Sequence, residues 1–188
     1  FTPLALIGAA PSLVLVSRTV PVNDLRGFIA WAKARRGQVN YGSSGVATTP
    51  HLNGALLDSL GDLGMVHVPY RGTGAVYAEL LRGDVHVLLD VPATAATHIQ
   101  AGTVKALAVT SERETPLAPG VPTGEAAGLP GLVSETWFGI FGPANMPPAL
   151  AARITEASGA AMADADLRAR LLSLGVDPRA GDGAALSE

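Results

Sequence analysis

Short apolar segments alternate with turns and helical patterns through the first half of the chain. Short strands are expected at 38–41, 65–69 and 85–89, and each is followed by a turn and then by residues with helical spacing. Strands joined by helices through short connections favour a mostly parallel sheet with helices on both faces. In such sheets, ligands bind outside the carboxyl ends of the strands. The pattern predicts an α/β fold with a ligand site at one sheet edge.

The rest of the chain adds further elements to this core. Apolar runs predict strands at 4–7 and 13–17, broken at 8–12, and also at 104–109 and 136–142. Helices are expected at 24–37, 52–61, 73–81, 92–100, 148–163 and 166–174, with Asn23 or Asp24 and Thr73 as N-caps. Residues 114–130 indicate a surface excursion with a short helix near Glu125. From Asp177 onward the polar tail shows no regular element. Trp137 and Phe138 are expected in the core.

One of the strand–helix connections, from Asn40 to His51, is built from small, hydroxylated and glycine residues. Pro50 stands where a first helical turn tolerates proline. Such a connection directs backbone N–H groups and the positive end of a helix dipole at one point, which suits a carboxylate or a phosphate. Glycine and serine also favour plain turns, so a connection without a ligand is the alternative.

Two other connections are expected at the same sheet edge. Tyr70-Arg71-Gly72 opens a second strand–helix turn, and Asp90 ends the strand at 85–89. Arg71 either binds a ligand carboxylate through two hydrogen bonds or is a solvated loop arginine. Asp90 either caps the helix opened by Pro92 or accepts a hydrogen bond from a ligand. Together these loops predict one concave site.

Catalytic and metal-binding interpretations fit the sequence less well. The glycine-rich connection lacks the lysine of a phosphate-binding P-loop and the third glycine of a dinucleotide fingerprint. Its Gly42-Ser43-Ser44-Gly45 segment does not match the G-x-S-x-G spacing of hydrolases. His51 is therefore interpreted as a neutral hydrogen-bonding residue rather than a base for Ser43 or Ser44. The four histidines lack a metal-ligand spacing, with His67 and His86 taken as structural, and no cofactor is expected.

Composition excludes several classes of function. The chain has 188 residues, a net charge of −3 and no cysteine. Thiolate chemistry and disulfides are therefore excluded, and no basic surface for nucleic acid is expected. No apolar run reaches the length of a membrane span. Because the chain starts at Phe1 in the middle of a pattern, we expect a processed or truncated piece of a longer protein.

Motifs along nearly the whole chain resemble one family. They are Tyr41-Gly-Ser-Ser-Gly-Val-Ala-Thr-Thr-Pro-His51-Leu52, Met65-Val-His-Val-Pro-Tyr-Arg-Gly72, Gly83-Asp-Val, Leu89-Asp90, Lys105-Ala-Leu-Ala-Val-Thr110, Val121-Pro-Thr123, Gly128-Leu-Pro and Trp137-Phe-Gly139. In this order they resemble the Bug (TctC-like) periplasmic solute-binding proteins of tripartite tricarboxylate transporters. Ala47 departs from the family, which usually has glycine there, and Ala55 stands where an acid is frequent.

The resemblance implies a type II periplasmic-binding-protein-like fold whose two lobes close on a small carboxylate. Residues 10–136 would form the complete middle lobe. Residues 1–9 and 137–188 would supply the hinge and the carboxy-terminal part of the other lobe, whose amino-terminal part is absent. The implied protein is an exported, periplasmic monomer that presents its ligand to membrane permease subunits and catalyses no reaction. The candidate ligand-binding residues are Ser43, Ser44, Gly45, Ala47, Thr48, His51, Tyr70, Arg71, Gly72 and Asp90.

Two other functions remain open at this stage. The glycine-rich connection could serve a phosphate-handling or acyl-transfer enzyme. The same architecture also occurs in the effector-binding domains of transcription regulators, which would make this chain a sensor rather than a transport component.

Overall fold

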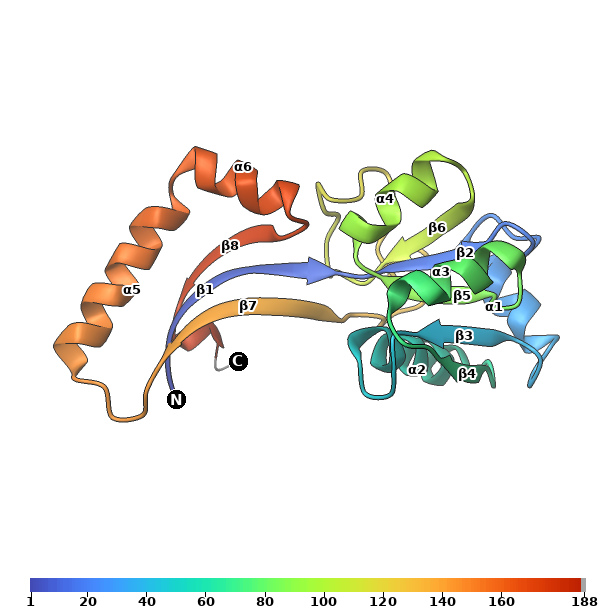
Figure 1. Cartoon of the computed structure of the whole chain (residues 1–188), viewed down its shortest axis with the longest axis horizontal. Helices are drawn as coiled ribbons and strands as arrows, with labels where there is room; N and C mark the ends of the chain where they lie inside the picture. Colours follow the sequence, from blue (N-terminus) through green and yellow to red (C-terminus); the bar gives the residue numbers. More distant parts are fainter. Residues whose placement is uncertain (187–188) are drawn as a thin grey trace. The chain divides into compact units, whose positions relative to one another are not determined.

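The computed structural model describes residues 1–186 and divides the chain into two compact units. The middle unit is Pro11–Glu135, and the split unit combines Phe1–Ala10 with Thr136–Glu188. The strands are β1 (Thr2–Pro11), β2 (Leu13–Ser17), β3 (Asn40–Ser43), β4 (Val66–Pro69), β5 (Val87–Asp90), β6 (Val104–Val109), β7 (Glu135–Gly142) and β8 (Asp177–Asp182) (Figure 1). The helices are α1 (Leu25–Lys33), α2 (Thr49–Gly61), α3 (Thr73–Arg82), α4 (Pro92–Gln100), α5 (Pro148–Met162) and α6 (Ala165–Ser173), followed by the 3-10 turn η1 (Ala184–Leu186).

The middle unit contains a five-stranded sheet in the order β4-β3-β5-β2-β6. Strand β3 pairs in parallel with β4 and β5, whereas β2 runs antiparallel to β5 and β6. Leu13 at the start of β2 therefore faces Asp90 and Val109 at the ends of β5 and β6. The carboxyl ends of β3, β4, β5 and β6 lie at one edge of the sheet. This arrangement confirms the predicted α/β fold with a mostly parallel sheet.

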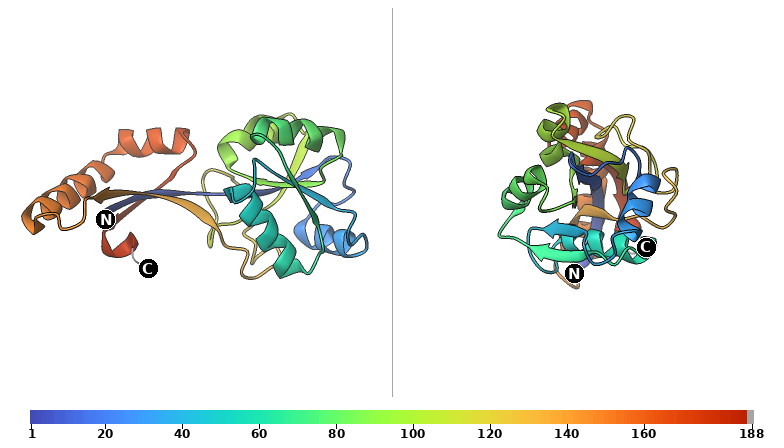
Figure 2. Two further views of the ribbon diagram at one scale, coloured as in Figure 1. Left: turned by 60° about the horizontal axis from the view of Figure 1, so that its bottom comes forward. Right: turned by 90° about the vertical axis from the view of Figure 1, so that its right-hand side faces the viewer.

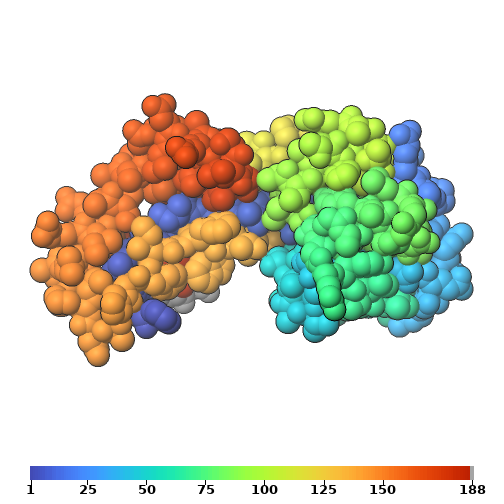
Figure 3. Space-filling model, viewed as in Figure 1, coloured from blue at the N-terminus to red at the C-terminus, as the bar shows by residue number. Residues whose placement is uncertain are grey.

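Helices cover both faces of this sheet, as Figure 2 shows. On one face, Phe28 of α1 and Leu57 of α2 are fully buried in a core with Val14 and Val16 of β2. On the other face, α3 and α4 lie side by side (Figure 3) and pack on a second core that contains Leu13 and Leu15. Successive residues of β2 thus point into opposite cores, which explains why this strand is apolar throughout.

Local sequence signals set several helix boundaries in the middle unit. Asp24 caps α1, since its Oδ1 accepts the backbone N–H of Gly27 at 2.7 Å. Helix α2 ends at Gly61, followed by Asp62 in the left-handed conformation. The predicted cap at Thr73 is wrong, because Gly72 is the N-cap of α3 and Thr73 is its first residue. Gly72 has a φ of 95°, a conformation that favours glycine.

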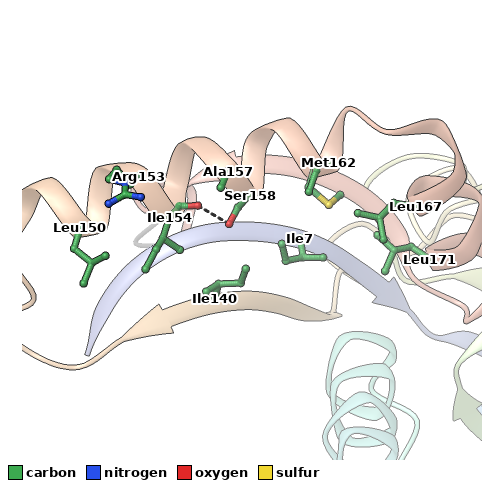
Figure 4. A pocket seen from close by; sticks show the side chains of 11 residues that line it. Ile7, Ile140, Leu150, Arg153, Ile154, Ala157, Ser158, Met162, Leu167 and Leu171 are labelled. Atoms are coloured by element: carbon green, nitrogen blue, oxygen red, sulfur yellow. Dashed lines mark hydrogen bonds between the residues drawn. The ribbon is translucent and has the colours of Figure 1, made fainter.

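The split unit contains a three-stranded sheet in the order β7-β1-β8, and α5 and α6 lie beside it. Figure 4 shows apolar side chains of α5 and α6 facing Ile7 of β1 and Ile140 of β7. A hollow of about 570 Å³ lies between them. Trp137, Phe138 and Phe141 of β7 are 57%, 42% and 41% exposed, so the expectation that Trp137 and Phe138 belong to a core is wrong.

Two strand predictions are also corrected in the split unit. Strand β1 continues through Gly8 to Pro11, although the glycine predicted a break. A Cβ on Gly8 would lie 2.5 Å from the carbonyl oxygen of Asp177, so glycine here permits close approach of the neighbouring strand. That neighbour is β8, which pairs antiparallel with β1 in the tail where no element was expected.

The helix expected near Glu125 is absent from the described structure. A bridge and a series of turns occupy residues 123–129 instead. The hydroxyl of Thr123 accepts the Ala126 N–H at 3.2 Å, but Gly128 has a φ of 93° and ends the helical turn.

Candidate ligand-binding site

Residues 44–48 connect β3 to α2 at the carboxyl edge of the sheet, and the carbonyl group of Gly45 organises this loop. The Gly45 oxygen accepts hydrogen bonds from Ser43 Oγ at 3.0 Å and from Thr48 Oγ1 at 2.7 Å. Gly45 has a φ of 139°, which side chains rarely adopt. Ala47 has a φ of 63° and lies in the left-handed region. The loop is therefore a defined turn with internal hydrogen bonds.

The start of α2 presents unused backbone donors. Thr48 is the N-cap residue, but its hydroxyl bonds back to Gly45 and makes no capping hydrogen bond to the helix. Within residues 1–186, the backbone amides of Ser44, Val46 and Thr49 have no hydrogen-bond partner. Free N–H groups at the positive end of a helix favour an anion. The loop thus combines open donors with the dipole of α2.

A stack of three rings lies beneath the loop. Tyr41 of β3 stacks on His67 of β4, with ring centroids 4.9 Å apart, and His67 stacks on His51 of α2 at 4.1 Å. His67 Nε2 lies 2.7 Å from Ser43 Oγ, and His51 Nδ1 accepts the backbone N–H of Ala47 at 3.0 Å. Burial, with His51 as a second cause, lowers the pKa of His67.

The role of His67 is missed by the sequence interpretation, which treats it as structural. The His67 ring contacts Ser43, whereas from the sequence only His51 is weighed as a base for a serine, and that role is rejected. The pairing of β3 with β4 places Tyr41 opposite His67, and only that register would have linked His67 to the loop. Ser43 is fully buried, so its hydroxyl is not accessible for attack on a substrate.

The second predicted loop lies beside the first. The backbone N–H of Tyr70 donates to the Ser43 carbonyl at 2.9 Å, which joins the ends of β3 and β4. Burial raises the pKa of the Tyr70 phenol. Arg71 and Gly72 are exposed at the start of α3. The structure therefore brings Tyr70 to the glycine-rich loop and leaves the Arg71 guanidinium in solvent.

Asp90 occupies a more enclosed position than the loop residues. It is 6% exposed, and its Oδ2 accepts a hydrogen bond from Thr94 Oγ1 at 2.6 Å. The N-cap of α4 is Val91, so the predicted capping role of Asp90 is wrong. Burial raises the pKa of Asp90. Burial also raises the pKa of the neighbouring Tyr77, and the Asp90 carboxylate is the second cause.

A buried polar network ties α2 to the ends of the sheet. Asn53 Nδ2 donates to Ser12 Oγ at 2.9 Å, and Asn53 Oδ1 accepts from Ser134 Oγ at 2.6 Å. Thr110 Oγ1 accepts the Ser12 N–H at 2.8 Å and donates to the Ser134 carbonyl at 2.5 Å. These contacts hold the helix that carries the loop against the segments beside β2, β6 and β7.

The described residues contain no cluster of three or more histidine, aspartate or glutamate side chains arranged for a metal ion. Among residues 1–186, no helix is long and apolar enough to cross a membrane. The hollow of about 570 Å³ is lined mainly by apolar side chains of the split unit and includes none of the candidate residues.

Comparison with known proteins identifies the family. Residues 1–187 match the family described as TctC, the tripartite tricarboxylate transporter family receptor. The chain belongs to the TctC family. A relative from Pseudomonas sp., the UPF0065 protein in the tcbD-tcbE intergenic region, is 34% identical over 182 residues. This match covers 96% of the chain and 54% of the relative, so the chain spans about half the length of that protein.

Solved TctC-type structures share the fold. R. palustris Rpa4515 with adipate is 27% identical with a TM-score of 0.82, covering 100% of this chain and 62% of that protein. MatC (Rpa3494) from Rhodopseudomonas palustris with bound malate is 31% identical with a TM-score of 0.74, and the match covers 94% of this chain and 60% of that protein. These likenesses confirm the predicted fold class and the predicted family of periplasmic binding proteins. The individual ligand-binding residues remain predictions.

Proposed function

We propose that this chain is part of an extracytoplasmic receptor that captures a small carboxylate for a tripartite tricarboxylate-type transporter. The observation that carries the proposal is the loop from Ser43 to Thr48. It places free backbone amides at the start of α2, at the shared carboxyl edge of parallel strands. A carboxylate fits these donors because it accepts several hydrogen bonds and carries the charge that the helix dipole favours.

The relatives support a carboxylate over a phosphate. R. palustris Rpa4515 was solved with adipate, and MatC with malate. Both ligands carry carboxylates, and both proteins share the fold of this chain. We therefore assign the amides of Ser44, Val46 and Thr49, together with the Ser44 hydroxyl, to one ligand carboxylate. Tyr70, Arg71 and Gly72 would border the remainder of the ligand, and Asp90 would support the wall behind it.

Capture without a chemical step is the proposed activity. The serine and histidine that lie close together, Ser43 and His67, hold the loop in shape, and the Ser43 hydroxyl is fully enclosed. The proposal also includes an exported, periplasmic, monomeric receptor that delivers its ligand to membrane permease subunits. Membership of a transporter receptor family supports the delivery of a ligand. Neither a phosphate-handling enzyme nor a transcription regulator has a comparable observation in its favour.

Calorimetry tests the proposal with adipate, malate, other dicarboxylates, tricarboxylates and inorganic phosphate as titrants. At least one carboxylate should bind, and phosphate should not compete with it. Ser44→Ala is the informative variant, because the Ser44 hydroxyl makes no hydrogen bond within residues 1–186. Its loss should weaken binding by roughly 1–3 kcal/mol while leaving the unfolding free energy unchanged.

Two further variants complete this experiment. Thr48→Val removes the bond to the Gly45 carbonyl and should lower both affinity and stability. Ser59→Ala on the exposed side of the same helix serves as the matched control and should change neither quantity. Binding of phosphate in preference to every carboxylate, or an unchanged affinity in Ser44→Ala, would contradict the assignment.

A further inference from the structure

Ala47 adopts a conformation that its side chain disfavours. Within residues 1–186, the non-glycine residues with positive φ are Ala47, Asp62 and Asn145. Asparagine and aspartate visit this region more readily, whereas the Cβ of alanine meets the following carbonyl oxygen there. The loop therefore requires a contact that holds Ala47 in place, because an isolated alanine would leave the left-handed region.

His51 supplies that contact. The Ala47 backbone N–H donates to His51 Nδ1 at 3.0 Å, from the loop to the first turn of α2. An imidazole nitrogen accepts a hydrogen bond only when it carries no proton. The neutral His51 ring must therefore carry its proton on Nε2, and the charged ring would present a second donor to the Ala47 amide.

The orientation of the His51 ring is set by its stacking on His67. His51 and His67 stack with centroids 4.1 Å apart and planes inclined by 29°. His67 is held in turn by Ser43 Oγ at 2.7 Å and by the Tyr41 ring. The contacts run from the end of β3 through both histidines to Ala47, so they join the first and last parts of the same loop.

We propose that His51 is a positioning residue that holds Ala47 left-handed and thereby directs the loop amides toward the ligand. Its effect on carboxylate affinity rests on the function proposed above, whereas its effect on the loop does not. Loss of the Nδ1 acceptor would release Ala47 from this contact. The titratable groups facing His51 are His67 from β4 and Tyr41 from β3. Burial, with the Asp58 carboxylate of α2 as a second cause, raises the pKa of the Tyr41 phenol.

The first test needs no ligand and uses nuclear magnetic resonance on the 188-residue chain. The ring nitrogens of His51 should show an unprotonated Nδ1 near neutral pH. In His51→Leu, the Ala47 amide should exchange with water about tenfold faster, the scale of one lost hydrogen bond. His51→Asn should restore slow exchange, because the asparagine carbonyl oxygen can take the place of Nδ1.

A double-mutant cycle separates positioning from general destabilisation. Glycine adopts positive φ without strain, so in an Ala47→Gly background the added His51→Leu change should shift the backbone chemical shifts of residues 45–48 only slightly. With Ala47 present, the same change should shift them strongly. Equal perturbation in both backgrounds, or a protonated Nδ1 in the wild-type chain, would overturn the proposal.

Affinity for adipate and malate is the second readout. Where one of them binds, His51→Leu should weaken binding about five- to tenfold with Ala47 and less than about twofold with Gly at 47. If no carboxylate of the calorimetric series binds while the resonance results hold, the positioning role stands and the proposed function fails. If binding is normal in His51→Leu, the positioning role fails and the proposed function stands.

Discussion

Gly54 of α2 lies directly against the ring of Tyr41 in β3. A Cβ at Gly54 would lie 2.3 Å from Cδ2 and 2.5 Å from Cε2 of that ring. Tyr41 is 5% exposed and belongs to the core beneath α2. The glycine thus allows the helix that follows the candidate loop to approach the sheet closely, and this distance sets where the loop amides lie.

Gly54→Ala should destabilise the protein by roughly 1–3 kcal/mol, because the added methyl group overlaps a ring that the core holds in place. Gly74→Ala in α3 is the matched control, since a Cβ there would meet no atom within 4 Å. Alanine also favours a helix over glycine, so this control should gain up to about 1 kcal/mol. Urea denaturation measures both, and equal effects would contradict the packing argument.

Asn53→Leu should cost roughly 1–3 kcal/mol of unfolding free energy, chiefly because it leaves the buried Ser12 hydroxyl without its partner and also removes the partner of the half-buried Ser134 hydroxyl. The affected hydroxyls are those of Ser12 and Ser134. When both serines are also replaced by alanine, the cost of Asn53→Leu should fall sharply. Additive losses in the triple variant would show that Asn53 acts through its shape rather than through these bonds.

Asp90 should make the protein less stable as the pH rises through its raised pKa. The folded chain holds the Asp90 proton more tightly than the unfolded chain, whose aspartates have a pKa of about 3.9. Its stabilising contribution is therefore complete below that value and is lost above the folded pKa. In Asp90→Asn this loss should disappear, and urea titrations across the acid range compare the two slopes.

Asparagine retains an oxygen acceptor for the Thr94 hydroxyl, so Asp90→Asn preserves the contact seen at 2.6 Å. Thr94→Val provides the complementary control, because it removes that contact and leaves the carboxyl group. Identical pH slopes in the wild type and Asp90→Asn would contradict a raised pKa at this position.

His67 should titrate below the ordinary histidine value of about 6.5, because burial and the neighbouring His51 lower its pKa. As the pH falls below that value, the unfolded chain takes up a proton that the folded chain refuses, so stability decreases. His67→Gln should remove part of this acid destabilisation. Proton resonances of the His67 imidazole follow its titration directly. A titration midpoint above about 6.5 would contradict the lowered pKa of His67.

Much of the middle unit is predictable because its signals are local. Leu13-Val-Leu-Val is apolar on both sides, which predicts a strand buried between two layers, and β2 is such a strand. Asp24 precedes an amphipathic segment and caps α1, as a short polar side chain at that position should. The glycine and hydroxyl residues at 42–49 predict a turn before a helix, and the loop is found there.

Other features depended on which strands meet. The polar segment Asp177–Asp182 becomes β8 only because β1 offers it hydrogen bonds, and Gly8, which predicted a break, permits that close pairing. The same holds for His67, whose contact with Ser43 follows from the register of β4 on β3. Asp90 likewise bonds to Thr94 rather than capping α4.

The difference between the features that the sequence predicts and those that it misses has a physical basis. Hydrophobic period, caps and turn residues act within a few positions of the chain, so the amino-acid sequence determined the order of elements, the α/β class and the glycine-rich loop. Strand register, ring stacking and burial depend on residues far apart in the chain. Only the tertiary structure could therefore place Tyr41, His67 and His51 beneath the loop and hold Ala47 in its left-handed conformation.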